Sequence, residues 1–208
     1  MLRSIVNAAV KICPKIETFL ADVLRKLAFH VARSAGAGTI WDVQKVKLYL
    51  DTSVISHIDA PHKPEAEAMT YAFYRFVEER SGEYELVISP VVEQEVENCP
   101  EPKRTKLKTF LLELDCAVLP ATPQAEDLVE VYVAKGVLTA KHHNDLSHIA
   151  YAVVSGCHFV ISWNFEHFVN DRTPVRVNIV NAKRGYCAVT ILSPPDLMRA
   201  IHDTEPKI

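Results

Sequence analysis

The chain has 208 residues, a formal net charge of −3 and 24% charged residues, a composition typical of one globular domain with an appendage. A net charge this close to zero excludes nucleic-acid binding through bulk electrostatics, so any such contact needs a local basic patch. No apolar run reaches the ~20 residues that a membrane-spanning helix needs, and we therefore expect no membrane partner.

The five cysteines are odd in number and scattered, with no Cys-x-x-Cys pair. This spacing argues against a disulfide framework and a structural zinc site, and it fits a reducing cytosol, so we expect a cytoplasmic protein. The chain also lacks the glycine-rich loops that hold phosphate in nucleotide-dependent enzymes, which argues against a nucleotide cofactor.

Residues 1–44 differ in pattern from the rest of the chain. Apolar side chains recur every three or four positions, at Leu2, Ile5, Ala9, Ile12, Ile16, Phe19, Val23 and Leu27. This spacing predicts an amphipathic helical extension, which Pro14 interrupts. The extension could bind a partner, support self-association, pack on the main domain or act as a presequence. Gly36-Ala37-Gly38 is typical of a linker, so we place the main domain at 45–208.

From residue 45 onward, predicted strands alternate with predicted helices. The strands are expected at 45–50, 84–89, 116–119 and 158–162, and the helices at 64–80, 90–98, 101–114, 123–135 and 144–155. In the tail, 176–180 and 188–192 suggest one more strand, followed by a helix after Pro194-Pro195. Strands separated by helices predict a three-layer α/β/α fold with a central, mostly parallel sheet.

Acidic and amide residues recur close to the predicted strand ends. They are Asp51 after the first strand, Glu93, Glu95 and Glu97 in the helix after the second, Asp145 in the helix before the fourth, and Asn164 after the fourth. Because open α/β sheets collect functional side chains at the carboxyl ends of their strands, we expect these groups to converge. Converging carboxylates need a cation, and oxygen-only ligands select Mg²⁺ or Mn²⁺. The reaction class that follows is metal-assisted hydrolysis of a phosphodiester.

Each of these residues also has an ordinary structural explanation. An aspartate after a strand is often a helix cap, although here Thr52 or Ser53 is expected to cap the helix that follows. The three glutamates could form a solvated helix face. Asp145 could be a carboxylate that only interacts favourably with the dipole at the start of its helix. Asn164 could be a turn residue. Taken one at a time, the ordinary explanations are the better ones.

Taken together and in order, four motifs resemble the PIN-domain nuclease family, and within it the VapC-type ribonucleases of toxin–antitoxin systems. The motifs are Leu50-Asp51-Thr52-Ser53-Val54-Ile55-Ser56, Ile88-Ser89-Pro90-Val91-Val92-Glu93-Gln94-Glu95, Asn144-Asp145-Leu146-Ser147-His148-Ile149-Ala150 and Ile161-Ser162-Trp163-Asn164-Phe165-Glu166-His167-Phe168. The resemblance covers residues 46–198 and leaves the extension unmatched. It implies a PIN-like three-layer α/β/α fold.

The resemblance also implies a Mg²⁺- or Mn²⁺-dependent endoribonuclease with a defined ligand set. Asp51 matches the first metal-binding aspartate of the family, and Glu95 matches its helix glutamate, with Glu93 as the second choice. Asp145 matches the aspartate that precedes the His-Ile-Ala segment. Asn164 stands where many members carry a fourth aspartate; an amide offers one oxygen but no charge, so a second ion should bind more weakly.

Several neighbours of these residues are expected to support the site. Thr52 and Ser53 should orient Asp51 or a metal-bound water. Three histidines flank Asp145 in the sequence, His142, His143 and His148, and this pattern is also compatible with a His/Asp metal site. We expect His148 to line the pocket or to pack behind it rather than to bind metal, and we treat His167, near Asn164, in the same way.

RNA contact is expected at the only dense basic cluster, although a solvated helix face is an equally good explanation for a run of charges. The cluster consists of Lys103, Arg104, Lys106 and Lys108. A second, looser patch consists of Arg172, Arg176, Lys183 and Arg184. Neither patch indicates which RNA sequence would be preferred.

The favoured hypothesis is therefore a PIN-domain endoribonuclease, with RNA as substrate and with an antitoxin protein and a homodimer as possible partners. A non-catalytic PIN-like module for RNA binding or scaffolding is the main alternative, suggested by Asn164 and by the extension. A hydrolase of small phosphoesters is a third. Whether the protein is a toxin or a stand-alone RNA-processing enzyme depends on a neighbouring antitoxin gene.

Overall fold

Strand β1 (Val46–Leu50) is the middle strand of a five-stranded sheet in the computed structural model, which describes residues 45–203. The extension expected at 1–44 lies outside the described residues, as does 204–208. The other strands are β2 (Tyr84–Ile88), β3 (Cys116–Val118), β4 (Phe159–Ile161) and β5 (Thr190–Leu192). Their order is β3-β2-β1-β4-β5, and each pair of neighbours runs parallel.

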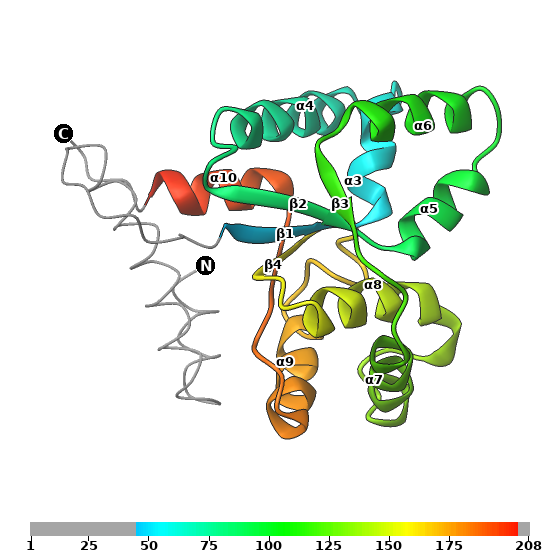
Figure 1. Ribbon diagram of the computed structural model, residues 1–208, viewed down its shortest axis with the longest axis vertical. Helices are drawn as coiled ribbons and strands as arrows, with labels where there is room; N and C mark the ends of the chain where they lie inside the picture. The colour runs from blue at the N-terminus through cyan, green and yellow to red at the C-terminus, as the bar shows by residue number, and fades with distance from the viewer. Residues whose placement is uncertain (1–44, 204–208) are drawn as a thin grey trace.

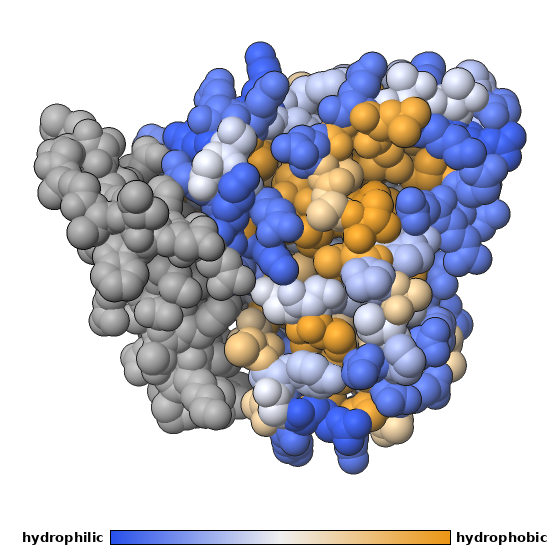
Figure 2. Space-filling view, in the orientation of Figure 1, coloured by the Kyte–Doolittle hydropathy of each residue, from blue (hydrophilic) through white to orange (hydrophobic). Residues whose placement is uncertain are grey.

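Helices cover both faces of this sheet (Figure 1). One face packs on α3 (Thr52–Ser56), α4 (Pro64–Glu78), α5 (Pro90–Glu97), α6 (Lys103–Glu113) and α10 (Pro194–His202). The opposite face packs on α7 (Pro123–Ala134), α8 (His143–Val154) and α9 (Thr173–Arg184). Short 3₁₀ turns, η1 (His57–Asp59) and η2 (Ala140–His142), complete the described elements. Seen from the same side in a space-filling view, hydrophobic residues gather over the edge strand β3 (Figure 2). The expected three-layer α/β/α fold with a parallel sheet is confirmed. None of the helices described is long and apolar enough to cross a bilayer.

The alternation of side chains along β1 divides the core into two parts. Leu48 and Leu50 pack into the core on the α4 side, whereas Tyr49 points into the core on the α8 side. All three are fully buried, as expected for a strand that is covered on both faces. Burying a leucine contributes about 1.5–3 kcal/mol, so this short apolar run fixes both the position and the direction of the central strand.

The chain changes direction across the sheet between β1 and β4. From β1 it moves outward through β2 to β3, and it then returns to the other side of β1 to form β4 and β5. Such a switch point leaves a crevice at the carboxyl ends of the two central strands. Asp51 follows β1 and Ser162 follows β4, so both lie at this crevice.

One prediction in the tail is wrong. Residues 176–180 were expected to contribute to a strand, but they lie inside α9, and only Thr190–Leu192 forms the last strand. The alternating valines and isoleucine also fit a helix, because Val177 and Val180 are three positions apart and both are buried. Pro174 in the first turn and the left-handed Gly185 after the last residue mark the ends of the helix.

A buried hydroxyl on α7 provides a test of the core. Tyr132 donates a hydrogen bond of 2.5 Å to Asn181 Oδ1, and both side chains are fully buried. Tyr132→Phe leaves that oxygen unpaired, so we expect the free energy of unfolding in urea to fall by about 1–3 kcal/mol. Tyr74 is the matched control, because its buried hydroxyl has no partner among the described residues. Tyr74→Phe should be neutral or stabilising, and equal losses in the two variants would contradict this account.

Candidate metal centre

Hydroxyl groups hold the Asp51 carboxylate in place. Asp51 occupies the N-cap position of α3, so the expectation that Thr52 or Ser53 is the cap is wrong. The Asp51 side chain makes no capping hydrogen bond. Instead its Oδ2 accepts hydrogen bonds from Ser53 Oγ at 2.5 Å and Ser162 Oγ at 2.7 Å. The backbone N–H of Asp51 continues the pairing of β1 with β4 through Ile161 O at 3.0 Å. Its carboxylate is therefore fixed, with Oδ1 turned toward His148.

Glu95 is the glutamate of α5 that reaches the crevice. Its Oε2 lies 3.1 Å from His148 Nε2, and its Oε1 accepts a hydrogen bond of 3.0 Å from Asn144 Nδ2. Glu93, two residues earlier, is exposed on another side of the same helix. Positions two apart on a helix point about 200° apart around its axis, which is why only one of the two glutamates reaches the crevice.

His148 lies between two carboxylates and is almost completely buried. Its Nε2 is 3.1 Å from Glu95 Oε2 and 3.5 Å from Asp51 Oδ1. Its Nδ1 is 2.7 Å from the Tyr49 hydroxyl, which is in turn 2.6 Å from Ser89 Oγ. His148 thus lies between the two carboxylates and contacts both of them directly.

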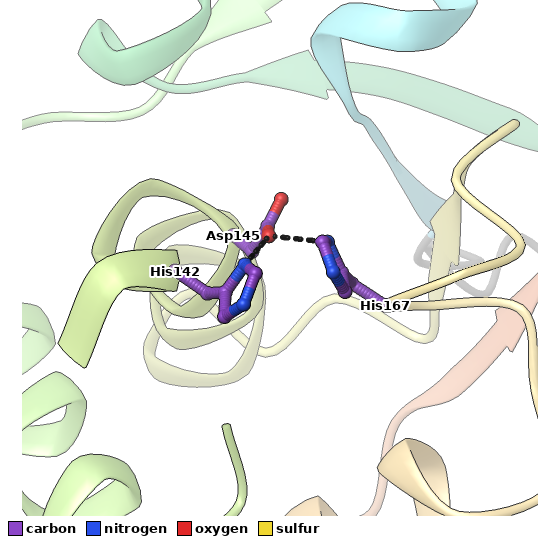
Figure 3. Close-up of side chains that lie close together, drawn as sticks. All are labelled: His142, Asp145 and His167. Atoms are coloured by element: carbon purple, nitrogen blue, oxygen red, sulfur yellow. Dashed lines mark ion pairs between the residues drawn. The ribbon is translucent and has the colours of Figure 1, made fainter. Parts of the chain in front are cut away.

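Asp145 belongs to a neighbouring group of side chains. It stands in the first turn of α8, where its Oδ2 lies 3.3 Å from His142 Nδ1 and 2.9 Å from His167 Nδ1 (Figure 3). Its Oδ1 accepts a hydrogen bond of 3.2 Å from Asn164 Nδ2. The oxygen of that amide accepts the backbone N–H of His167 at 3.0 Å. Asn164 therefore holds Asp145 and His167 through its two amide atoms.

The group around Asp51 and the group around Asp145 are connected by hydrogen bonds. Ser162 Oγ donates to Asp51 and accepts the backbone N–H of Asn164 at 2.9 Å, and Asn164 holds Asp145. Within the described residues, the donor atoms of Asp51, Glu95 and His148 lie within 4.8 Å of one another, and so do those of His142, Asp145 and His167. The crevice thus contains two places where a cation could be held.

The ionisable groups of the crevice alter one another. Burial by itself raises the pKa of Glu95, but the hydrogen bond and charge of His148 outweigh it and lower that pKa to about 2. Burial by itself lowers the pKa of His148, but the hydrogen bond to Glu95 and the charges of Asp51 and Glu95 raise it above its ordinary value. Burial raises the pKa of Asp145, the charge of His167 opposes this, and the charge of Asp51 adds to it. Three acidic groups, Asp51, Glu95 and Asp145, thus lie close enough to influence one another, and such a gathering favours a cation.

The buried hydroxyl of Thr52 has no hydrogen-bond partner among the described residues. Its Oγ1 is buried close enough to Glu95 to help lower the pKa of that carboxyl, yet it does not reach hydrogen-bond geometry with any described residue. A buried polar atom without a partner costs free energy. This hydroxyl and the carboxylate oxygens of Asp51 and Glu95 form a donor set that fits a hard divalent ion or its water ligands.

The structure places the predicted site residues unevenly. Asp51, Glu95, Asp145, Asn164, Thr52, Ser53 and His148 all gather at the crevice, whereas Glu93 does not. Asn164 acts on Asp145 and His167 through hydrogen bonds and does not present a free amide oxygen. The sequence placed His142 beside Asp145, but the contact of His167 with Asp145 was not predicted. Two weak signals point to it: His142 stands three residues before Asp145, and His167 three after Asn164.

The basic cluster on α6 is largely neutralised by nearby carboxylates. Arg104 pairs with Glu101 at 2.9 Å, Lys106 pairs with Asp59 at 2.7 Å, and Lys108 pairs with Glu97. Lys103, at the start of the helix, makes no such pair among the described residues. It lies close enough to His57 for its charge to help lower the pKa of that imidazole, although burial is the main cause.

Among solved structures, one with a similar fold is a protein–DNA complex. It is the crystal structure of VapBC2 from Rickettsia felis bound to a DNA fragment from their promoter, with a TM-score of 0.47 and 17% sequence identity. The alignment covers 71% of this chain and 98% of that chain. No protein-family model matches the chain, and no curated protein matches its sequence. A likeness this weak carries no functional conclusion.

The Glu95–His148 contact gives a pH-dependent prediction for the protein with metal removed by a chelator. The pKa of Glu95 falls from 4.5 to about 2 on folding, so its stabilising effect is present above pH 4.5 and is lost as the pH falls toward 2. At ~1.4 kcal/mol per pKa unit the limit is about 3 kcal/mol, which solvent screening reduces to about 1–2 kcal/mol. Glu95→Gln should therefore be less stable by that amount at pH 7, and the difference should shrink below pH 4.5.

Urea unfolding between pH 3 and pH 7 measures this difference directly. Glu93→Gln is the matched control, since it makes the same change at an exposed position of the same helix. A difference between wild type and Glu95→Gln that does not vary with pH would contradict the assigned ion pair.

Proposed function

We propose that this protein is a metal-dependent endoribonuclease that hydrolyses RNA phosphodiester bonds. The observation that supports this most strongly is the convergence of Asp51, Glu95 and Asp145, from three segments far apart in sequence, at the switch point of a parallel sheet. Buried or half-buried carboxylates in one crevice favour a divalent cation, and the ordered motifs of the sequence resemble those of PIN-domain nucleases. The ion proposed is Mg²⁺ or Mn²⁺.

Asp51 and Glu95 are the proposed ligands of the cation, with Asp145 completing the negative crevice. A bound divalent ion supplies an acidified water as nucleophile and stabilises charge on the phosphate. Ser53 and Ser162 hold the Asp51 carboxylate in one orientation, and Thr52 offers a hydroxyl to a water ligand. Preorganised ligands of this kind reduce the reorganisation needed during the reaction.

His148 has two roles in this proposal. Without a bound cation, its imidazolium neutralises part of the charge of Asp51 and Glu95. When a cation binds, the imidazole keeps Glu95 oriented through Nε2, while its Nδ1 remains anchored by Tyr49. His148 is accordingly a positioning residue for the carboxylates.

Asn164 is also proposed to be a positioning residue rather than a metal ligand. Both atoms of its amide are engaged, by Asp145 and by the backbone of His167. A fourth carboxylate at this position would repel Asp145, whereas the amide donates a hydrogen bond to it. The crevice therefore favours a mechanism that depends mainly on the cation held by Asp51 and Glu95.

The proposed substrate is RNA. The resemblance of the sequence motifs to VapC-type ribonucleases supports an antitoxin protein and a second copy of this chain as the proposed partners. A non-catalytic RNA-binding module is the second candidate, since His148 already supplies one positive charge between Asp51 and Glu95.

The two candidate functions differ in their response to loss of the metal ligands. In the presence of Mn²⁺ or Mg²⁺, we expect the protein to cleave single-stranded RNA, and we expect Asp51→Asn or Asp145→Asn to lower the rate at least ~100-fold, because each removes a carboxylate charge from the crevice. Asp127→Asn is the matched control, because it makes the same change at an exposed position of α7. Cleavage is measured on labelled RNA after removal of contaminating nucleases. Absence of cleavage by the wild type with either ion would leave only the binding module.

RNA affinity should depend on Lys103, the residue of the α6 cluster that makes no ion pair with a carboxylate among the described residues. Lys103→Ala, made in the Asp51→Asn background to prevent cleavage, should weaken RNA binding and reduce the slope of log affinity against log salt concentration by about 1. Lys108→Ala should change the slope less, because Glu97 already engages that ammonium group. Fluorescence anisotropy of a labelled RNA at several salt concentrations measures both. A larger effect at Lys108 would show that the ion pairs open on RNA binding.

A further inference from the structure

Two histidines and one aspartate form a compact group (Figure 3). His142 is the N-cap residue of α8, Asp145 is the third residue of that helix, and His167 lies in the turn that follows β4. Both Nδ1 atoms face Asp145 Oδ2, at 3.3 Å from His142 and 2.9 Å from His167. All three side chains are about one-fifth exposed, so water and ions can reach them.

These separations are those expected of ligands around one metal ion. With metal–nitrogen and metal–oxygen bonds of ~2.0–2.2 Å, donors are about 3.3 Å apart in a tetrahedral site and about 2.9 Å apart in an octahedral one. The two nitrogen–oxygen distances match these values, and the third pair of donors lies within 4.8 Å. A small movement of the imidazole rings would complete the geometry.

The surroundings hold the group in an orientation suited to metal binding. The second nitrogen of His167, Nε2, lies 3.5 Å from Glu166 Oε1, so that carboxylate can hold a proton on Nε2 when a metal ion replaces the proton that Nδ1 shares with Asp145. The Asn164 amide fixes the other oxygen of Asp145 and the backbone of His167. The imidazole rings of His142 and His167 pack with their centroids 4.0 Å apart.

We propose that His142, His167 and Asp145 bind one divalent transition-metal ion of the zinc class, at a position distinct from the pocket of Asp51 and Glu95. Two imidazoles and one carboxylate form a mixed nitrogen and oxygen donor set, which suits Zn²⁺, Co²⁺ or Ni²⁺ better than Mg²⁺. Three protein ligands leave at least one coordination position for water, as in metal sites that are open to exchange. The inference concerns metal binding and holds whether or not the protein cleaves RNA.

The test titrates Co²⁺ into the metal-free, full-length protein in the presence of excess Mg²⁺. We expect one Co²⁺ to bind and its visible absorption to intensify, since Co²⁺ absorbs more strongly when its coordination number falls below six. Because no thiol takes part, the near-ultraviolet charge-transfer band of cobalt thiolates should be absent. Zn²⁺ should displace the cobalt and abolish the visible spectrum.

Variants assign the signal to these side chains. The double variant His142→Ala/His167→Ala should lose at least ~100-fold in Co²⁺ affinity, since even the loss of a supporting residue around a metal costs about 10–100-fold. A control pair, His143→Ala/His202→Ala, removes two exposed histidines outside the group and should bind as the wild type does. Asp51→Asn should also retain Co²⁺ binding, which separates this site from the proposed nuclease centre.

Three results would overturn the proposal. They are a wild type that does not bind Co²⁺, a double variant that binds it equally well, and a control pair that loses as much affinity as the double variant. Circular dichroism checks that the variants are folded. If the alanine double variant does not fold, His142→Gln and His167→Gln take its place, because glutamine can still donate a hydrogen bond to Asp145 but provides no imidazole nitrogen; their unchanged Co²⁺ affinity would equally overturn the proposal.

Discussion

The buried contact of His148 with Asp51 and Glu95 is the interaction on which the crevice depends. Two carboxylates cannot lie this close in a largely buried place without a positive charge between them, because desolvation and mutual repulsion would protonate one of them. The imidazole supplies that charge, which explains why the pKa of His148 is raised while the pKa of Glu95 falls to about 2. The protein can therefore fold with its carboxylates already converged before any cation binds.

The same histidine connects the site to the core. Its Nδ1 contacts the hydroxyl of Tyr49, which reaches Ser89 at the end of β2. Tyr49 belongs to β1, so the strand that carries Asp51 at its end also anchors the imidazole that faces Asp51. Burial raises the pKa of Tyr49 far above its ordinary value, and its hydroxyl stays neutral. The packing of the central strand thus also helps to fix the orientation of the carboxylates.

Asn164 organises the second half of the crevice. The Asn164 side chain donates a hydrogen bond to Asp145 and accepts one from the backbone N–H of His167. The backbone carbonyl of Asn164 also accepts hydrogen bonds from the N–H groups of Phe168 and Val169, and Phe168 is fully buried. The backbone and the side chain of this one residue therefore close the turn after β4 and bring the His167 imidazole to Asp145. The two places differ in their donors: carboxylate oxygens dominate at Asp51 and Glu95, whereas two imidazole nitrogens accompany one carboxylate at Asp145, and this difference underlies the different cations proposed for them.

The sequence by itself determined the layers of the fold and the positions of Asp51, Asp145 and Asn164, because apolar runs, prolines and glycines act locally and parallel strands must end at one edge. It misassigned 176–180, where a short apolar pattern fits both a strand and a helix. Only the tertiary structure decided that His148 lies between carboxylates, since its partner Tyr49 is 99 residues away in sequence. It alone brought the imidazole of His167 to Asp145, through the turn that follows β4. Such pairings depend on how crossovers stack around the sheet, and no local pattern encodes them.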